Sequence, residues 1–485
     1  MILGINTFNH DASACLVDPT THQVLFAGHA ERYSRVKNDD KINDALLEDL
    51  LLHGKPTELC WFERPLLRNL RQIRSGQIPK FYSIENFLRR HGLGNLPIHR
   101  YHHHRAHAAQ AFYTAKMHSA GVLVIDAIGE WDTTSIWHAE GDKLVCKWNR
   151  WYPDSMGLFY SAITAGLGFK PNEEEYIVMG MAAYGRPCHV DLLKKLFFSR
   201  FNPPSFALRH NPHRGLHRWL PAGLEPADVA ASAQVIWEEY LVGTARWMHK
   251  KMGIRNLVIA GGGALNCMAN DRIRQLGLFD EIYVPANPGD AGLSLGAIAA
   301  HLSKPIWMRD AYLGHDIRRR VPVSVVVSML ESGHVVGIAN GRAEWGPRAL
   351  GNRSLLADPR TPEMKEQVND IKYREKFRPF APAVLDEHAD SIFDVDHNNM
   401  RYMQFAVRCH EPESYPAVCH VDNTARVQMV DRSNPSVLRL ILEEWHRRTG
   451  CPMLLNTSLN IKGEPLVNTI EDAQRFSQRH QVVVF

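Results

Sequence analysis

Four histidines lie within six positions of the sequence, at 102, 103, 104 and 107, in the stretch YHHHRAHAAQAFY. The alanines that follow predict a helix over 103–116, on which His103 and His107 are four residues apart and share one face. Two imidazoles at that spacing can bind one divalent cation. No Glu stands inside the spacing, which excludes a metalloprotease HExxH motif.

Two aspartates at the ends of predicted elements can supply acidic ligands for the same cation. Asp126 ends the apolar run VLVID, and Asp290 lies in NPGDAGLSLGA just before a helix of small residues. Two imidazoles with two carboxylates favour Fe, Mn or Zn over Mg or Ca, so the four side chains predict a transition-metal site. Of His102 and His104, one is expected to face solvent and the other to hydrogen-bond to a ligand.

Two glycine-rich loops predict a nucleotide site. The first, GGGALNC, follows the apolar strand LVIA and contains Gly261, Gly262, Gly263 and Asn266. Glycines there allow close backbone approach and present N–H groups to phosphate, although the loop matches neither a Rossmann GxGxxG motif nor a P-loop. The second loop places Gly289 before a helix N-terminus, which favours anions. The alternative for each loop is a tight turn with close packing.

The C-terminal half is rich in arginines that are interleaved with Gly, Pro and the aromatic residues Trp345, Phe377 and Phe380. This pattern favours side chains that point into a pocket. Guanidinium groups bind phosphate and carboxylate oxygens with paired hydrogen bonds, so a small doubly charged anion such as carbamoyl phosphate, together with ATP, suits the cluster. The alternatives are a nucleic-acid patch and solvated surface charge. The candidate residues are Arg348, Arg374, Arg378, Arg426 and Asn456.

The elements that must position these residues include two hairpin regions with one layout. Residues 1–28 and 121–148 each contain an apolar strand, a polar turn, a second strand, a turn and a third strand. Duplicated units of this kind hold phosphates in actin-like and sugar-kinase ATPases, and the alternative is two unrelated hairpins. Other predicted elements are helices at 44–53, 228–252 and 291–301, a proline-rich loop at 200–226, and a wall of the active cleft or an acid-rich helix start at 173–184.

Length and composition limit the class of protein. The 485 residues predict two or three domains, and a change in composition near 304–321 predicts a boundary. With 45% hydrophobic and 22% charged residues, the chain is neither disordered nor collagen-like nor a coiled coil. The N-terminal residues predict a strand instead of a signal peptide, and no run is long and apolar enough to span a membrane.

The cysteines and the net charge indicate the cellular compartment and the kinds of partner. Eight scattered cysteines without a CxxC motif exclude zinc fingers and a disulfide scaffold, and they favour reduced thiols in the cytoplasm. A net charge of +4 is too balanced to indicate a nucleic-acid partner.

Together, the motifs resemble the O-carbamoyltransferases of antibiotic and nodulation-factor biosynthesis. The resemblance spans nearly the whole chain, in order, and the C-terminal motifs are highly specific. The matching segments are NHDASA (9–14), AERYSRVKND (30–39), HHRAHA (103–108), VMGMAAYG (178–185), GGGALNC (261–267), NPGDAG (287–292), EWGPRALGNRS (344–354), REKFRPFAP (374–382), TARVQ (424–428) and NTSLNIKGEP (456–465).

The resemblance implies an α/β fold with an N-terminal duplicated actin-like (ASKHA, RNase H-like) domain over 1–305 and a C-terminal YrdC-like domain over 306–485. The YrdC-like domain is then expected to join carbamoyl phosphate and ATP into carbamoyl adenylate. The actin-like domain is expected to pass the carbamoyl group to a hydroxyl of a small-molecule acceptor. The implied cofactor is Fe(II), with Mn or Zn as alternatives and Mg accompanying ATP. The expected protein is cytoplasmic, acts in secondary metabolism, forms a homodimer, and has no membrane or nucleic-acid partner.

Site roles follow from the same resemblance, motif by motif. His103, His107, Asp126 and Asp290 are the implied metal ligands, and the five residues of the arginine cluster line the carbamoyl phosphate pocket. Three residues from the N-terminal motifs are the implied catalytic groups. Lys37 is expected to approach the carbamoyl adenylate, His10 and Asp11 to lie near the acceptor, and His10 to deprotonate its hydroxyl.

The sequence departs from the family in two places. Ile177 occupies a position where members usually have Lys, and the stretch between Asp126 and Asp290 is shorter than in aminoglycoside-modifying members. Acceptor selection is expected in that stretch, so the acceptor cannot be transferred from a relative. The alternatives are tRNA threonylcarbamoyl transfer and an inactive nucleotide-binding scaffold. Hydrogenase-maturation carbamoyl transfer is excluded, since it brings CxxC zinc fingers and an acylphosphatase domain.

Overall fold

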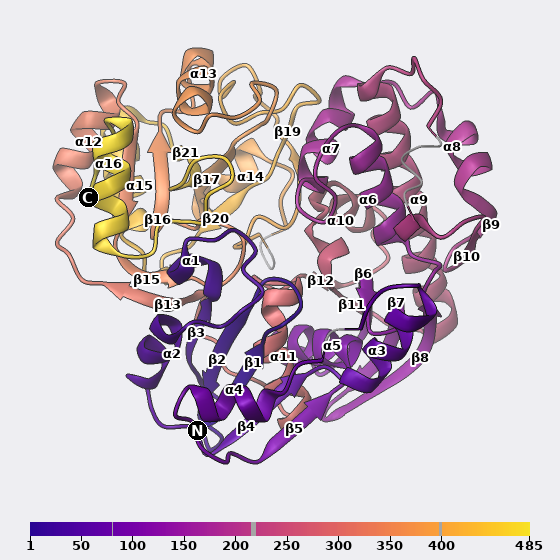
Figure 1. The fold of residues 1–485 in the computed structure, drawn as a ribbon. Helices are drawn as coiled ribbons and strands as arrows, with labels where there is room; N and C mark the ends of the chain where they lie inside the picture. The colour runs from indigo at the N-terminus through magenta and orange to yellow at the C-terminus, as the bar shows by residue number, and fades with distance from the viewer. Residues whose placement is uncertain (80, 215–219, 397–399) are drawn as a thin grey trace. The chain divides into compact units, whose positions relative to one another are not determined.

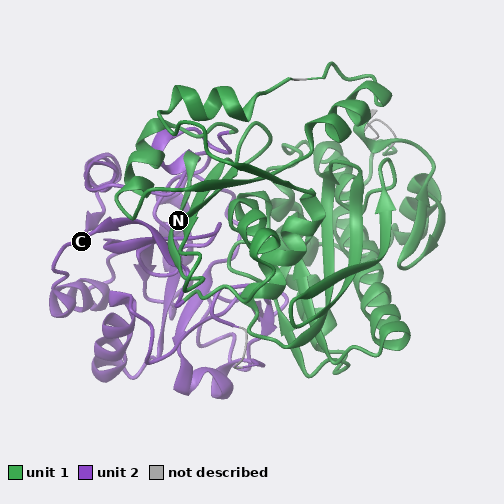
Figure 2. Cartoon of the chain, turned by 90° about the horizontal axis from the view of Figure 1, so that it is seen from below, with its two compact units in different colours: residues 1–30, 40–308 green, residues 31–39, 309–485 purple. Residues whose placement is uncertain are grey.

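The computed structural model describes residues 1–79, 81–214, 220–396 and 400–485 (Figure 1). The chain divides into two compact units, coloured separately in Figure 2. Unit 1 comprises residues 1–30 and 40–308, and unit 2 comprises residues 31–39 and 309–485. The segment 31–39 therefore belongs with the C-terminal unit, which the expected division into 1–305 and 306–485 does not provide for.

Unit 1 contains two five-stranded sheets with the same strand order. One has the order β3-β2-β1-β4-β5 and the other β8-β7-β6-β11-β12. In each sheet the first three strands along the chain pair antiparallel, and the next two add in parallel beside the first. The two hairpin regions expected from the sequence thus start two sheets of one topology. The strands are β1 (Ile2–Asn6), β2 (Ser13–Val17), β3 (Val24–His29), β4 (Glu58–Phe62), β5 (Ile98–Tyr101), β6 (Ser119–Gly129), β7 (Asp132–Glu140), β8 (Lys143–Trp151), β11 (Asn256–Ala260) and β12 (Glu281–Tyr283).

Helices accompany both sheets of unit 1, and their sequences explain their ends. Asn43, Ser83 and Ser155 accept a hydrogen bond from the third residue after them, which caps three helix starts. The helices are α2 (Asp44–Leu51), α3 (Pro65–Arg74), α4 (Ile84–Arg90), α5 (His103–Thr114), α6 (Met156–Gly166), α7 (Glu175–Met181), α8 (Val190–Phe197), α9 (Pro226–Met252), α10 (Cys267–Arg274) and α11 (Leu293–Leu302). The helices predicted from the sequence correspond to α2, α5, α9 and α11.

The proline-rich stretch 200–226 contains a small hairpin as well as loop, and this hairpin is separate from the five-stranded sheets of unit 1. Strands β9 (Phe198–Asn202) and β10 (Ser205–Leu208) form a hairpin there. The reason is aromatic packing, because the rings of Phe198 and Phe206 lie 6.1 Å apart across the two strands. Residues 215–219 lie outside the described part of the chain.

Unit 2 is built on a six-stranded mixed sheet with the order β20-β17-β21-β16-β14-β22. Strands β14, β16 and β17 are buried along their whole length, which is typical of a sheet covered on both faces. The elements are α1 (Ala30–Ser34), β13 (Tyr312–Ile317), α12 (Val323–Glu331), β14 (Val336–Ala339), β15 (Gly341–Glu344), β16 (Arg353–Ala357), α13 (Pro362–Ile371), β17 (Ala381–Leu385), α14 (Ala389–Ile392), β18 (Val407–Arg408), β19 (Thr424–Ala425), β20 (Gln428–Val430), α15 (Val437–Thr449), β21 (Met453–Ser458), α16 (Ile470–His480) and β22 (Val483–Val484).

Two arginines fix the segment 31–39 to unit 2. Arg32 is buried and donates to the carbonyls of Glu344 and Gly346, the latter over 2.7 Å. Arg35 donates to the carbonyls of Leu466 and Pro465. Because a buried guanidinium needs acceptors for its five N–H groups, these carbonyls account for the position of the segment.

Two further observations bear on the expectations from composition. All eight cysteines are free thiols. No helix among the described residues is both long enough and apolar enough to cross a membrane.

Candidate metal centre

Four side chains of unit 1 converge on one point. The Nε2 atom of His103 lies 2.9 Å from Asp126 Oδ2 and 3.4 Å from Asp290 Oδ1. The Nε2 atom of His107 lies 3.4 Å and 3.3 Å from the same two oxygens, and the two Nε2 atoms are 3.1 Å apart. Metal–ligand bonds of about 2.0–2.2 Å place neighbouring ligand atoms about 3 Å apart, so these four atoms outline one coordination sphere. The structure therefore brings the four expected ligands together.

Each of these ligands sits at the end of a secondary-structure element. His103 and His107 occupy the first two turns of α5, Asp126 lies near the end of β6, and Asp290 opens a short 3-10 helix before α11. Helices α5 and α11 approach closely because Gly296 has no side chain, and a Cβ there would lie 2.4 Å from the carbonyl oxygen of Ala106. This contact holds the two histidines against Asp290.

Burial and charge oppose each other in the cluster. Burial disfavours the charged form of every member, but the neighbouring aspartates outweigh it and raise the pKa of His103 well above its usual value. Hydrogen bonds from both histidines likewise outweigh burial and hold the pKa of Asp126 well below its usual value. The carboxylates thus stay ionised and attract positive charge to the point between them.

The outer partners of the cluster differ from the expectation. His104 is buried, and its Nδ1 atom lies 2.8 Å from the hydroxyl of Ser135. His102 does not simply face solvent, because its Nε2 atom lies 3.1 Å from Glu130 and 3.4 Å from Asp132. Burial raises the pKa of Glu130 to about 7 and that of Asp132 to about 6. The sequence pattern did not select these two acids, although Glu130 directly follows the strand that carries Asp126 and Asp132 begins the next strand.

The predicted acceptor-side residues lie beside this centre. His10 Nδ1 is 3.0 Å from Asp11 Oδ2, in the loop between β1 and β2. Burial lowers the pKa of His10, but the hydrogen bond to Asp11 and the charges of Asp11, Asp290 and Asp126 outweigh it and raise the pKa to about 9. His10 thus senses both aspartates of the cluster, and it carries a proton at neutral pH in the absence of a cation.

The first glycine loop lies against Asp126. Gly261 has φ of +85°, and its N–H donates to the carbonyl of Pro288 in the second loop over 2.9 Å. A Cβ on Gly262 would lie 3.4 Å from Asp126 Oδ1, and a Cβ on Gly263 would lie 2.9 Å from Ile125. The loop therefore packs tightly on the end of β6.

The other two residues of the predicted nucleotide site, Asn266 and Gly289, differ in whether they leave space for a ligand. Asn266 caps α10 by accepting from Ala269 N, and its amide also bonds to Gln234. Its side chain is therefore occupied within the protein. Gly289 has open space where a Cβ would stand, and so it is the member of the set that leaves room for a ligand.

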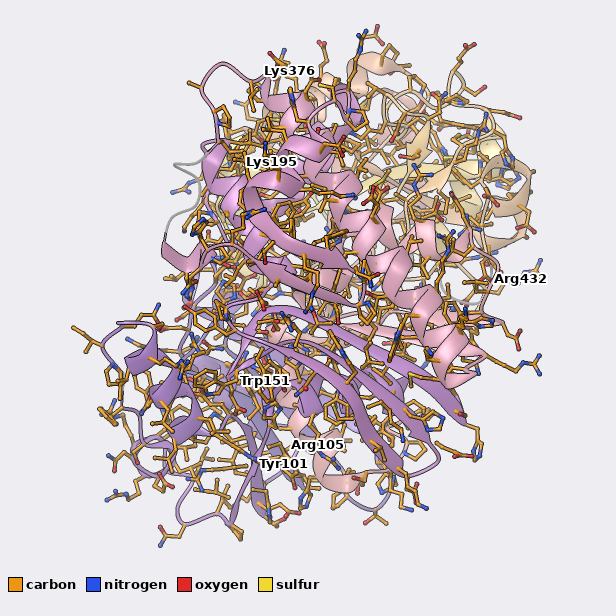
Figure 3. The ribbon with its side chains drawn as sticks, turned by 90° about the vertical axis from the view of Figure 1, so that its right-hand side faces the viewer. Tyr101, Arg105, Trp151, Lys195, Lys376 and Arg432 are labelled. Carbon is orange, nitrogen blue, oxygen red and sulfur yellow. The ribbon has the colours of Figure 1, made fainter. Side chains whose placement is uncertain are left out.

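Two more groups among the described residues can hold a metal ion. Glu58, His99 and His301 lie together at partly exposed positions, and Tyr101, whose side chain Figure 3 labels, bonds to His301 Nδ1 over 2.7 Å. The other group comprises Cys188, His189 and Asp228. Each offers three ligands, whereas the cluster on α5 offers four and is deeper in the protein.

Two of the five predicted anion-binding residues of unit 2, Arg374 and Arg378, lie near one buried lysine. Burial, then the charges of Arg374 and Arg378, lower the pKa of Lys372 well below its usual value, so the three cations lie close together. The guanidinium of Arg374 stacks 3.9 Å above the ring of Phe380. The Nζ atom of Lys372 donates to Asn460 O over 2.8 Å. The sequence pattern did not select this lysine.

Two other predicted residues of unit 2 have internal partners. Asn456 donates to Gln428 over 2.7 Å and to the carbonyl of Ala349, and its Oδ1 atom has no hydrogen-bond partner among the described residues. Lys37, in the segment 31–39, pairs with Glu31 at 2.8 Å. Both residues are therefore held by unit 2 itself.

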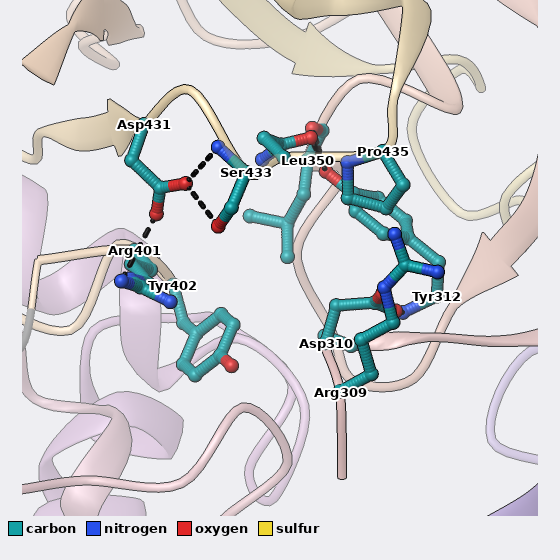
Figure 4. Close-up of a pocket in the computed structure, with 11 residues that line it drawn as sticks. Arg309, Asp310, Tyr312, Leu350, Arg401, Tyr402, Asp431, Ser433 and Pro435 are labelled. Carbon is teal, nitrogen blue, oxygen red and sulfur yellow. Dashed lines mark hydrogen bonds and ion pairs between the residues drawn. The ribbon is translucent and has the colours of Figure 1, made fainter.

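A separate pocket of unit 2 does not include the predicted residues. It is lined by Arg309, Asp310, Tyr312 and Asp431, among others, and Asp431 pairs with Arg401 at 3.0 Å (Figure 4). None of the five residues predicted to bind carbamoyl phosphate lines it.

Comparison with known proteins decides the family. Residues 82–299 match the model of the carbamoyltransferase N-terminus, and residues 327–485 match the model of the carbamoyltransferase C-terminus. The chain belongs to the carbamoyltransferase family. This carbamoyltransferase is 33% identical to the uncharacterized protein sll1178 of Synechocystis sp., over 99% of this chain and 94% of the relative. It is 35% identical to the nodulation protein NolO of Bradyrhizobium diazoefficiens, over 76% of this chain and 75% of the relative.

Among solved structures, full-length HypF in its phosphate- and nucleotide-bound form aligns with 62% of this carbamoyltransferase and 46% of its own chain. The alignment has 14% identity and a TM-score of 0.40. Component A of the (R)-2-hydroxyglutaryl-CoA dehydratase of Acidaminococcus fermentans aligns with a TM-score of 0.35 and 13% identity, over 62% of this chain and 98% of its own. Similarity this low supports no inference about fold or function.

Proposed function

We propose that this carbamoyltransferase is an ATP-dependent O-carbamoyltransferase that acts on a hydroxyl of a small molecule. One observation carries the proposal: two imidazole nitrogens and two carboxylate oxygens from α5, β6 and the start of α11 lie within 4.8 Å of one another, in a chain of this family. In this proposal unit 1 is the actin-like transfer domain, and unit 2 is the YrdC-like domain that makes carbamoyl adenylate.

The proposed metal ligands are His103, His107, Asp126 and Asp290. The donor set fits Fe(II), Mn(II) or Zn(II), and the Nε2 atoms of both histidines face the two carboxylate oxygens. When bound, the cation neutralises the two carboxylates and stabilises the negative charge on a leaving phosphate. The positions of the four ligand side chains determine where the charge of the leaving phosphate would be held.

In the proposed reaction, carbamoyl phosphate, water and ATP first give carbamoyl adenylate, phosphate and pyrophosphate. Arg348, Arg374, Arg378, Arg426 and Asn456 would bind the carbamoyl phosphate. The charges of Arg374 and Arg378, which both act on the buried Lys372, match a small dianion. Their clustering also makes an adjacent anion favourable without any rearrangement of the protein.

In the second step, the acceptor oxygen forms a bond to the carbamoyl carbon, and the bond from that carbon to the AMP oxygen breaks. AMP leaves with the electron pair, and the hydroxyl proton passes to a base. His10 is the proposed base once the metal site is filled, because a bound cation would offset the charges of Asp290 and Asp126 that help to keep its imidazole protonated. Asp11 accepts from its Nδ1 atom and orients its other nitrogen. The N–H groups of Gly262, Gly263 and Gly289 would hold the adenylate phosphate beside Asp126, while Gly261 bonds to Pro288 and shapes the loop.

The test is to incubate the metal-loaded protein with ATP, carbamoyl phosphate and a panel of hydroxylated acceptors. Transfer predicts AMP, pyrophosphate and a product heavier by one carbamoyl group. Exchange of labelled pyrophosphate into ATP that depends on carbamoyl phosphate isolates the first step. No exchange, with metal and nucleotide bound, would instead support the inactive scaffold.

A further inference from the structure

Helix α3 is oriented with its apolar face outward, the reverse of what an amphipathic helix of a globular protein normally does. Leu66, Leu70 and Ile73 are 79%, 58% and 60% exposed. On its other face, Arg68 and Arg71 are only 5% and 8% exposed. Exposing three large apolar side chains in order to bury two guanidinium groups is unfavourable on both counts, so the arginines must have a reason to point inward.

The two buried arginines have different surroundings. Arg68 has a charged partner, because its Nη1 atom donates to the carboxylate of Glu63. Arg71 lies over the ring of Tyr152, 5.7 Å from its centroid, and its Nε and Nη1 atoms are buried with no hydrogen-bond partner among the described residues. No ion pair of Arg71 is found in the described part of the chain. The buried region under α3 thus holds two guanidinium groups beside Glu63, which also lies within reach of the charge of Glu130, and two donor atoms of Arg71 are unfilled.

Side-chain contacts connect this buried region to the loop that carries His10. Arg68 lies 5.4 Å from the ring centroid of Tyr82, which stacks at 4.5 Å on Phe8 in the loop that carries His10. The start of α3 is fixed to the strand end beside the centre, because Arg64 N donates to Glu130 and Trp131 donates to Leu67 O. The first glycine loop approaches Asp126 from between β11 and α10, so the nucleotide and a group bound under α3 would reach the centre from different elements.

We propose that Arg71, with Arg68 beside it, binds an oxyanion on the acceptor, so that the acceptor of this carbamoyltransferase is a hydroxy compound bearing a phosphate or carboxylate group. The inference rests on the proposed function and assigns the substrate class of the same site. The unfilled, desolvated Nε and Nη1 atoms of Arg71 donate from different sides of the guanidinium, and an oxyanion oxygen suits either of them. An oxyanion held there would anchor the acceptor on the side of His10.

The first test needs no acceptor and no turnover. Thermal unfolding of the full-length, metal-loaded protein is followed in sodium chloride, sodium phosphate or sodium malonate at equal ionic strength. Phosphate and malonate represent the two kinds of oxyanion. The variants are Arg71→Met, Arg71→Lys as the conservative change, and Arg74→Met as the matched control, since Arg74 is exposed on the same helix.

The proposal expects a rise of the unfolding temperature in phosphate or malonate over chloride for the wild type and for Arg74→Met. Arg71→Met is expected to lose the rise that phosphate or malonate produces over chloride, while Arg71→Lys keeps some of this rise. In chloride, Arg71→Met is expected to unfold at a higher temperature than the wild type, because a buried charge without hydrogen bonds has been removed. A rise that is equal in Arg71→Met and wild type overturns the proposal, whatever the unfolding temperature in chloride. Whichever anion gives the Arg71-dependent rise identifies phosphate or carboxylate as the recognised group.

The second test compares acceptors in pairs that differ only by a phosphate or carboxylate group. The wild type is expected to use the anionic member with kcat/KM higher by about tenfold or more, and Arg71→Met to lose this preference. Pyrophosphate exchange and metal content should remain at wild-type levels in Arg71→Met. No exchange in the wild type would refute the proposed function, whereas normal exchange with no anion preference would refute only the acceptor assignment.

Discussion

The Nε2 atoms of His103 and His107 face each other across 3.1 Å, and Asp126 Oδ2 lies within 3.4 Å of both. A hydrogen bond between the two imidazole nitrogens places one proton on one of them. The other nitrogen and the two carboxylate oxygens then carry no proton. A single cation would satisfy all four atoms at once. This relationship leads to the first prediction.

Substituting Asp126→Asn should lower the metal content by about one ion per chain and reduce carbamoyl transfer by at least about 100-fold. The amide keeps the size of the side chain but removes the charge that holds the cation. Elemental analysis of dialysed protein, together with product formation, measures both effects, and far-UV circular dichroism checks the fold. Tight binding of one ion to the variant would contradict the assignment.

The matched control for that experiment is His99→Ala, which removes a ligand from the group Glu58, His99 and His301. This variant should keep its activity and the tightly bound ion. If His99→Ala loses the ion and Asp126→Asn keeps it, the metal belongs to the outer group instead.

The glycine loops allow a prediction that separates packing from ligand binding. Gly261→Ala should destabilise the protein by about 1–3 kcal/mol, because its φ is +85° and the new Cβ would lie 2.2 Å from the carbonyl oxygen of Ile125. Gly289→Ala should leave the unfolding temperature nearly unchanged, because the space beside it is open. If the loop holds the adenylate, Gly289→Ala should still raise the KM for ATP. An unchanged KM would remove Gly289 from the nucleotide site.

The arginine cluster of unit 2 is tested by Arg374→Met. Removing a guanidinium that stacks on Phe380 beside Lys372 should raise the KM for carbamoyl phosphate by about tenfold or more, since hydrogen bonds to charged groups are among the strongest. The metal content of unit 1 should not change. Lys376→Met is the control, because Lys376 is exposed, as Figure 3 shows, and lies in the same segment. Equal KM values for the two variants would count against this pocket.

A pH dependence of stability follows from Glu387 and Arg439 in unit 2. Arg439 binds both carboxylate oxygens of Glu387, at 2.7 Å and 2.9 Å, and these hydrogen bonds lower the pKa of Glu387 from 4.5 to about 2. Because the folded pKa lies below the unfolded one, the stabilisation is complete above about pH 4.5 and is lost as the pH falls toward 2.

Glu387→Gln should therefore lower the unfolding temperature at pH 7 by about 1–3 °C, a modest effect because the carboxylate is partly exposed to solvent. The difference in unfolding temperature between the variant and the wild type should decrease as the pH is lowered from 5 to 3. Unfolding followed by circular dichroism at several pH values measures it. A gap that widens in acid would mean that another group controls the pair.

The sequence predicted the residues of the centre better than their surroundings. The pattern of His103 and His107 on one helix face and two aspartates at element ends was sufficient to select four side chains that the structure places together. Motif matching could do so because strand and helix ends are local features. Glu130 and Asp132 were missed, because their significance depends on contact with His102 across a turn that no local pattern specifies.

Orientation was harder still to predict. The spacing of Leu66, Leu70 and Ile73 on α3 indicates an apolar face that should be buried, yet all three are exposed. Only tertiary structure shows that Arg71 takes the inward position. Likewise, nothing in the segment 31–39 signals that Arg32 and Arg35 bond to carbonyls of residues more than 300 positions later.

That segment also limits how this gene can be recombined with those of its relatives. A single crossover near 309 would combine Arg32 and Arg35 from one parent with the carbonyl-bearing turns around Gly346 and Pro465 from the other. A chimaera intended to exchange the C-terminal half should therefore carry two inserts, 31–39 and 309–485, from the same parent. Libraries built with one junction would mostly sample mismatched pairs.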